Sequence, residues 1–250
     1  MFKVNGIQLR NLPLKRIGLF DSTRKQISKE VNSLSSSKDR VLKFHEITQN
    51  NTPFIIVDKE KSVAMLYIQG KLEKTVPVGV GKTYGDELNT VYYDFKNGIF
   101  GTTGTTTPSG QFMLKPVTAN CVNKSSYQSG NKMNVALLDG VQHPTDYTVN
   151  SSLALHQIPN EEMVSRMSLF SINGRRGMST GCVNFKPNDY EEFMKGIEAK
   201  TPVYILPEEC GNTLELVTAP NSRLWFRTKY ANTEQNNILE QAINKYFRKG

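Results

Sequence analysis

A mostly β domain flanked by helices at both ends, an α+β chain, is the fold class that the sequence predicts. Short apolar segments of strand length, separated by glycine-containing turns, begin at Phe54 and continue to Ile205. Apolar residues at helical spacing occur instead before Asn50 and after Glu234. These observations predict three regions: a helical flank over 1–50, a central domain over 53–206, and a hairpin with a helix over 207–250.

The composition is that of an ordinary globular protein. The chain has 250 residues, of which 38% are hydrophobic and 22% are charged. No apolar run approaches the ~18 residues that a membrane-spanning helix needs. The formal net charge of +8 favours acidic partners, such as a wall polymer or an anionic membrane surface. Nucleic acid is the competing partner, but the basic residues are scattered and no aromatic platform accompanies them.

The first flank is predicted to contain two helices. One is expected over 21–34, with Asp21 in its cap, and the other over 39–47, with Val41 and Phe44 on its apolar side. We expect both helices to pack against the central domain, and a docking segment for a partner is the alternative.

The central domain begins with hairpins and continues through two loop-like stretches. Strands are predicted over 54–57, 62–68, 73–80 and 112–114, with a return strand at Val203. The glycine- and threonine-rich stretch 98–110 is predicted to be a loop. The polar stretch 120–148 is long for a connection, so we expect a lid or substrate wall there.

Two further helices and a second hairpin complete the prediction. The helix over 161–170 is expected to place Met163, Val164, Met167 and Phe170 in the core. A helix over 190–199, capped by Asn188 or Asp189, should turn Phe193, Met194 and Ile197 inward. The carboxy-terminal region is expected to form a hairpin from 214–217 and 223–226, followed by a helix from Glu234.

A candidate nucleophile lies at Cys182. It follows Gly181 in a turn of small residues, where the backbone N–H groups are expected to stay open to an incoming carbonyl. His156 ends a short apolar strand upstream and is a candidate base that would make the thiolate available. Alternatively, both residues are buried structural side chains, because free cysteine is among the most buried residue types.

The remaining cysteines and histidines are weaker candidates. The chain has three cysteines, so Cys121 and Cys210 could pair and leave Cys182 free, or could be separate buried thiols. His143 lies in a polar segment and is expected at the surface, while His45 falls in a predicted helix. No metal or other cofactor is expected, because one cysteine and one histidine cannot close a zinc site.

Several motifs resemble the YkuD-type L,D-transpeptidases. The stretch 179–184, Ser-Thr-Gly-Cys-Val-Asn, is similar to the Ser/Thr-His-Gly-Cys-apolar-Asn signature of the family, and only Thr180 departs from it. The stretch 107–112 is similar to the Thr-Pro-x-Gly-x-Phe motif, 55–82 resembles the opening strand pairs, and 201–205 resembles the closing strand.

The resemblance implies a curved β-sandwich and an enzyme of the bacterial cell wall. Cys182 would attack the carbonyl before the terminal D-alanine of a peptidoglycan stem tetrapeptide, with His156 as the base. An amine of a second stem would then complete a 3→3 cross-link. The backbone carbonyl of Gln157 would orient the imidazole, while Ser179 and Asn184 would shape the turn. The resemblance also implies that a carbapenem acylates the thiol.

Two alternative functions remain open at this stage. With water as the acceptor the protein would be an L,D-carboxypeptidase, and with an inactive site it would be a wall-binding module. The unusually long segment between the histidine and the cysteine should elaborate the site. Arg175 and Arg176 could bind a substrate carboxylate in a bidentate manner, or could simply be exposed to solvent. A periplasmic or envelope location is expected, yet the amino terminus lacks the apolar core of a signal peptide. We therefore expect either a mature chain or export without a signal peptide.

Overall fold

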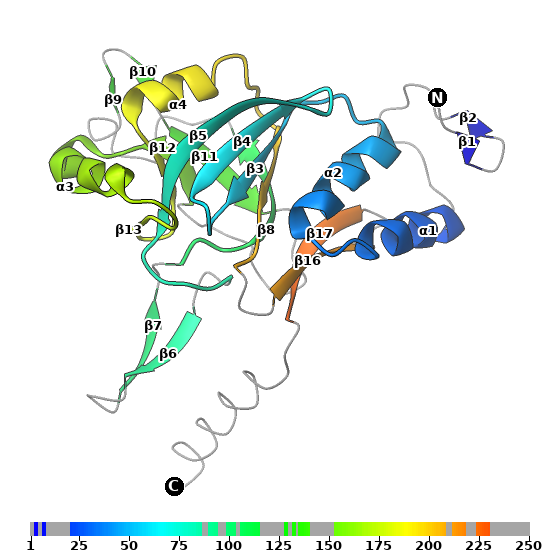
Figure 1. The fold of residues 1–250 in the computed structure, drawn as a ribbon, viewed down its shortest axis with the longest axis horizontal. Helices are drawn as coiled ribbons and strands as arrows, with labels where there is room; N and C mark the ends of the chain where they lie inside the picture. Colours follow the sequence, from blue (N-terminus) through cyan, green and yellow to red (C-terminus); the bar gives the residue numbers. More distant parts are fainter. Residues whose placement is uncertain are drawn as a thin grey trace, which may run out of the picture.

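A curled mixed sheet forms the centre of the computed structural model (Figure 1). The structure describes residues 3–4, 7–8, 21–86, 90–94, 99–103, 106–115, 128–129, 132–133, 135–140, 153–208, 212–218 and 224–230. The nine strands of the central sheet run in the order β13-β5-β14-β12-β11-β8-β15-β3-β4. They are β3 (Phe54–Asp58), β4 (Val63–Ile68), β5 (Lys71–Gly81), β8 (Gly110–Lys115), β11 (Val135–Gly140), β12 (Ala154–Gln157), β13 (Gly177–Ser179), β14 (Val183–Phe185) and β15 (Pro202–Ile205).

Smaller elements surround this sheet. The two-stranded pairs are β1 (Lys3–Val4) with β2 (Ile7–Gln8), β6 (Thr90–Asp94) with β7 (Ile99–Thr103), β9 (Gln128–Ser129) with β10 (Lys132–Met133), and β16 (Asn212–Thr218) with β17 (Leu224–Tyr230). The helices are α1 (Asp21–Asn32), α2 (Ser37–Thr48), α3 (Met163–Met167) and α4 (Pro187–Phe193), with 3-10 turns η2 (Asn160–Glu162) and η3 (Ser168–Ser171) beside α3. None of the helices that the structure describes is long and apolar enough to cross a membrane.

The long strand β5 closes the sheet on itself. Its first part pairs with β4, from Lys71 opposite Ile68 to Pro77 opposite Val63. Its last part pairs with β14, where Gly79 lies opposite Asn184. One strand therefore joins both ends of the strand order, which curls the sheet around an apolar interior.

Both faces of the sheet are buried, and alternate residues of β3 show this directly. Ile55 and Val57 face the inner core with Leu155, Val183 and their neighbours. Phe54 and Ile56 face an outer core that contains side chains from both flanks of the chain. The period of two along a strand explains how one segment serves two cores.

The two flanks of the chain meet on the outer face of the sheet. In Figure 1, α1 and α2 lie beside the hairpin β16–β17, and the carbonyl of Leu216 accepts hydrogen bonds from Ser28 (2.7 Å) and Asn32 (2.9 Å) of α1. The Arg40 guanidinium of α2 donates to the carbonyl of Leu214 at 3.0 Å. Residues far apart in sequence thus form one layer over the sheet.

Many sequence predictions are confirmed. Both amino-terminal helices form, and the Ser36 side chain caps α2 by accepting from the backbone N–H of Asp39 at 3.0 Å. The early strands, the strand around 112–114, the return strand at Val203 and the carboxy-terminal hairpin are also present. The helix expected from Glu234 lies outside the described residues.

Two predicted loops contain strands instead. Residues 99–103 of the stretch 98–110 form β7, because β-branched threonines favour extended structure. Within the predicted lid 120–148, β11 is a member of the central sheet, since Val135 to Leu138 supply an apolar run. The lid interpretation is therefore wrong for 135–140, while His143 and the other polar residues around it lie outside the described residues.

Two helix predictions also need correction. The stripe of Met163, Val164, Met167 and Phe170 is not core: none of the four is buried, and Val164 is 91% exposed. The expected single helix is broken into η2, α3 and η3, which leaves α3 too short for an apolar face to cover the sheet. Helix α4 begins at Pro187, where proline suits the first helical position, and no side chain caps it.

Candidate active site

The candidate site residues lie on two adjacent parallel strands. His156 of β12 is paired with Asn184 of β14, and Cys182 directly precedes β14. Because paired residues of adjacent strands share a face, Asn184 lies on the face that carries His156. Leu155 and Val183 belong to the inner core on the opposite face. The strand register therefore places an imidazole beside a carboxamide on one face, with Cys182 just before the second of the two strands.

The imidazole of His156 is buried and held at both nitrogens. Nδ1 contacts the backbone carbonyl of Gln157, the contact that the family resemblance implies, and Nε2 lies 3.1 Å from Nδ2 of Asn184. A carbonyl only accepts and an amide nitrogen only donates, so Nδ1 carries the hydrogen and Nε2 the lone pair. Burial lowers the pKa of His156 to about 4, and the imidazole is neutral at neutral pH.

A cation from α3 completes this arrangement. The Arg166 guanidinium donates to Oδ1 of Asn184 and forms an ion pair with Glu162. Since a guanidinium only donates, Oδ1 must face Arg166, and Nδ2 is left to face His156. Glu162, Arg166, Asn184 and His156 form a chain of polar contacts that ends at the imidazole.

The thiol of Cys182 is half-buried and forms no disulfide. Burial raises the pKa of Cys182, while a hydrogen bond with the backbone of Ala154 and the positive charge of Arg166 oppose that rise. Together with the low pKa of His156, burial thus favours the uncharged forms of both the thiol and the imidazole.

Ser179 and Gly181 shape the turn that presents Cys182. The Ser179 hydroxyl donates to the carbonyl of Cys182 at 2.5 Å and accepts from the N–H of Gly181 at 3.1 Å. Gly181 has a φ of +124°, and a Cβ there would lie 3.0 Å from the carbonyl oxygen of Thr106. The N–H of Gly181 is thus used within the turn, which corrects the expectation that it stays open to an incoming carbonyl.

Thr107 connects this turn to β5. Its side chain is completely buried, and its Oγ1 accepts from the N–H of Gly81 at 2.7 Å. The same hydroxyl donates to the carbonyl of Gly181 at 2.7 Å. In the sequence Thr107 stands out only as part of the motif at 107–112, because its contact with Gly181 depends on the closed sheet.

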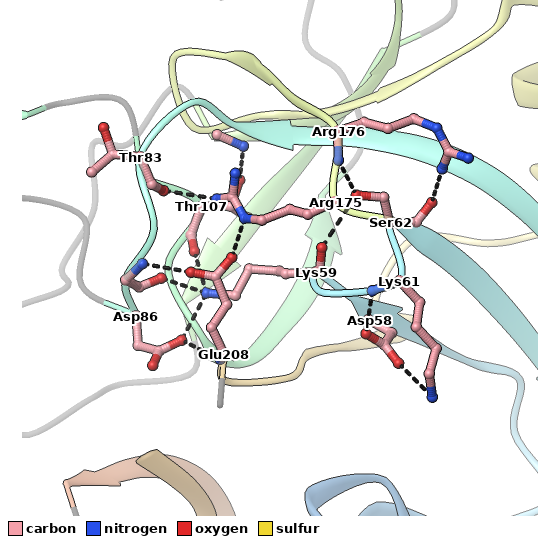
Figure 2. Close-up of polar contacts among 12 residues, drawn as sticks. Asp58, Lys59, Lys61, Ser62, Thr83, Asp86, Thr107, Arg175, Arg176 and Glu208 are labelled. Carbon is pink, nitrogen blue, oxygen red and sulfur yellow. Dashed lines mark hydrogen bonds and ion pairs between the residues drawn. The ribbon is translucent and has the colours of Figure 1, made fainter. Parts of the chain in front are cut away.

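The predicted carboxylate-binding arginines contact the protein itself. Arg175 forms an ion pair with Glu208 and donates to the carbonyl of Thr83 at 2.8 Å (Figure 2). It also lies over the ring of Tyr84. The Arg176 guanidinium donates to the carbonyl of Ser62 at 3.0 Å. These contacts give no support to a substrate-binding role for either guanidinium.

Arg166 is the site residue that sequence reasoning missed. It lies in the segment between His156 and Cys182, where the sequence carries charges of both signs and no motif distinguishes one arginine. Cys121 and Cys210, and with them their possible pairing, lie outside the described residues. Within the described part of the chain, no three His, Cys, Asp or Glu side chains gather in a way that could hold a metal ion.

The family model YkuD, described as the L,D-transpeptidase catalytic domain, matches residues 52–205. The chain belongs to the YkuD family of L,D-transpeptidase catalytic domains. This YkuD chain is mostly β, as expected for its family. A search of curated protein sequences found no match to it.

Solved L,D-transpeptidase structures resemble this YkuD chain at low identity. The Mycobacterium smegmatis L,D-transpeptidase is 13% identical, with a TM-score of 0.35, over 61% of this chain and 58% of that one. A mutant of the Enterococcus faecium L,D-transpeptidase is 17% identical, with a TM-score of 0.36, over 61% and 49%. The Xylanimonas cellulosilytica L,D-transpeptidase is 12% identical, with a TM-score of 0.36, over 72% and 76%. The match thus spans about half to three quarters of these relatives.

Proposed function

We propose that this protein is a cysteine-dependent L,D-transpeptidase that acts on peptidoglycan stem peptides in the cell envelope. One observation supports the proposal: Cys182 directly precedes β14, the strand that pairs with β12 at the buried, neutral imidazole of His156. Membership of the YkuD family supplies the reaction class, since the family model is that of a transpeptidase catalytic domain.

The first step forms a thioester on Cys182. The sulfur attacks the carbonyl of the bond before the terminal D-alanine, and the thiol proton moves to Nε2 of His156, the nitrogen with the lone pair. That proton replaces the Asn184 hydrogen bond at Nε2 and then passes to the departing amine. The carbon–nitrogen bond breaks, D-alanine leaves, and a neutral acyl-enzyme remains.

The second step decides between the two reaction types. When an amine of a second stem attacks the thioester, its proton goes to His156, the thiol is restored, and the product is a cross-link. When water attacks, the same steps release a shortened stem, and the protein is an L,D-carboxypeptidase. The family model is that of a transpeptidase catalytic domain, so the transpeptidase is the proposal.

Arg166 is proposed to assist the sulfur. Its positive charge favours the thiolate over the thiol and disfavours a protonated His156. Through Asn184 it also fixes which atom faces the imidazole. Arg166 thus orients the base and stabilises the negative charge that develops on Cys182.

The test is mass spectrometry of products from purified tetrapeptide muropeptides. Wild-type protein is expected to give cross-linked dimers with loss of D-alanine, and Cys182→Ala is expected to give none. Cys121→Ala and Cys210→Ala are matched controls that should retain activity. Products from Cys182→Ala would refute the proposed nucleophile, and shortened stems without dimers would make the protein a carboxypeptidase. If wild type gives no product and a carbapenem does not acylate it, the inactive wall-binding module replaces the proposal.

A further inference from the structure

A buried cluster of four charged side chains lies behind the nucleophile turn. Figure 2 shows Lys59, Asp86, Arg175 and Glu208 turned toward one another. The side chains of Lys59 and Asp86 are fully buried, with Nζ and Oδ1 2.7 Å apart, and those of Arg175 and Glu208 are 7% and 1% exposed. The two positive and two negative charges cancel, because an unpaired charge inside a protein is strongly unfavourable.

Lys59 uses its three hydrogen-bond donors on three different groups. Besides Asp86, its Nζ donates to the carbonyl of Gly85 at 2.5 Å and to the carbonyl of Thr107 at 2.9 Å. An ammonium group has three donors, so every one of them has a defined acceptor. The carbonyl of Thr107 is therefore held by an ammonium group whose other two donors bind Gly85 and Asp86.

Asp86 and Glu208 connect the cluster to the segments around it. Oδ1 of Asp86 accepts from the Ser109 hydroxyl and from the N–H of Glu208 at 3.1 Å. Glu208 accepts from the N–H of Gly85 at 2.6 Å and pairs with Arg175, which lies two residues before β13. The same charged cluster thus holds both the stretch 106–109 and the segment at Arg175 that leads into β13.

Thr107 connects the charged cluster to the peptide bond that precedes Cys182. Its hydroxyl is used twice, because it accepts from Gly81 and donates to the carbonyl of Gly181. No described residue forms a cis peptide bond, and in a trans peptide the C=O and the following N–H point in opposite directions. With the carbonyl of Gly181 directed at Thr107, the N–H of Cys182 points to the other side of the turn.

We propose that Thr107 is a positioning residue, held by the buried Lys59, that aims the backbone N–H of Cys182 at the oxyanion of the reacting carbonyl. This inference rests on the proposed function, because it needs a carbonyl to react at Cys182. It assigns the oxyanion donor to Cys182 instead of Gly181, whose N–H binds Ser179. A donor of this kind stabilises the transition state only when its direction is fixed in advance.

The experiment compares two reactions of the same thiol. Acylation by a carbapenem creates an oxyanion at the lactam carbonyl, whereas alkylation by iodoacetamide displaces iodide at a saturated carbon and creates none. Both rates are measured by intact mass on wild type, Thr107→Val and Thr107→Ser. Thr201→Val is the matched control, because the Thr201 hydroxyl is also buried and donates to a backbone carbonyl, that of Glu198, at 2.8 Å.

Thr107→Val is expected to lower the acylation rate ~10- to 100-fold and to leave the alkylation rate unchanged, since loss of alignment by about 1 Å costs up to ~10²-fold. Thr107→Ser retains the hydroxyl and should acylate close to the wild-type rate, as should Thr201→Val. A Thr107→Val protein that acylates as fast as wild type, or that loses both rates equally, overturns the inference. A wild type that alkylates but is not acylated overturns the proposed function instead.

A second variant tests the part played by Lys59 without touching the hydroxyl. Lys59→Met combined with Asp86→Asn removes one charge of each sign and keeps the side-chain volumes similar. The same selective loss of acylation is expected, in smaller degree, because the carbonyl of Thr107 loses its partner. If this double variant acylates at the wild-type rate, Lys59 has no part in positioning Thr107.

Discussion

The low pKa of His156 predicts an unusual pH dependence for thiol acylation. An ordinary imidazole has a pKa of 6.5, and burial lowers that of His156 to about 4. This difference disfavours the protonated ring by about 3 kcal/mol. A base must be unprotonated to accept the thiol proton, so the rate should be lost only as the pH falls through about 4.

The contrast with an ordinary histidine is largest between pH 4.5 and 6. At pH 5.5 a ring with a pKa of 6.5 is roughly nine-tenths protonated, whereas a ring with a pKa of about 4 is less than about a twentieth protonated. The acylation rate at pH 5.5 should therefore stay close to its neutral value instead of falling about tenfold. The assay is single-turnover acylation by a carbapenem, followed by intact mass from pH 4 to pH 9.

Two variants show whether His156 is the group that titrates. His156→Ala should lack the acidic limb and gain rate with rising pH, because the thiol then ionises without help. His143→Ala is the matched control and should keep the wild-type profile. An acidic limb centred near 6.5 in wild type would show that the ring is not buried in the reacting protein, and would refute the reasoning.

Substitutions at His156, Arg166 and Lys59 give the remaining predictions. His156→Ala should lower the acylation rate at neutral pH by ~10²- to 10⁴-fold with the fold intact by circular dichroism, and a normal rate would remove the base. Arg166→Met should slow iodoacetamide alkylation at neutral pH and move the acidic limb of acylation to higher pH, because the cation lowers the pKa of both Cys182 and His156. Arg166→Lys keeps the positive charge and should show smaller changes. Unchanged pH profiles in Arg166→Met would contradict the proposed role of Arg166. In urea unfolding, Lys59→Met alone should cost about 3–5 kcal/mol by leaving Asp86 buried without its cation, and adding Asp86→Asn should recover part of that loss; equal losses would contradict the pairing.

The strands and the nucleophile turn could be predicted because their signals are local. β3 and β4 are continuous apolar runs ended by polar turns, and the glycine before Cys182 is required by its own backbone angle. The register of β12 and β14 follows from burying Leu155 and Val183 on one face. The pairing of β12 with β14 joins distant segments and was not predicted from these local patterns; it is seen in the structure.

The parts that failed depend on contacts between distant segments. Whether 135–140 is a lid or a strand is decided by the open edges of β8 and β12, which no local pattern reveals. The partners of Arg175 come from residues 83 and 208, so its burial could not be read from the Arg-Arg pair itself. The pKa of His156 likewise depends on burial that only the closed sheet provides.

The exposed segment 160–171 shows why a helical apolar pattern misled the prediction. A helix held by its apolar stripe would bury that stripe, yet Val164 is 91% exposed and Ile172 just beyond the segment is 49% exposed. The contact that reaches inward is polar: Arg166 binds Asn184 beside the imidazole and is held from its own segment by Glu162. The position of this segment is thus tied to the active site through a charge, and a change in how it sits must alter the surroundings of His156 and Cys182. The packing of the segment between His156 and Cys182 accordingly follows from the polar side chain that it directs at the strands, because its apolar spacing did not predict that packing.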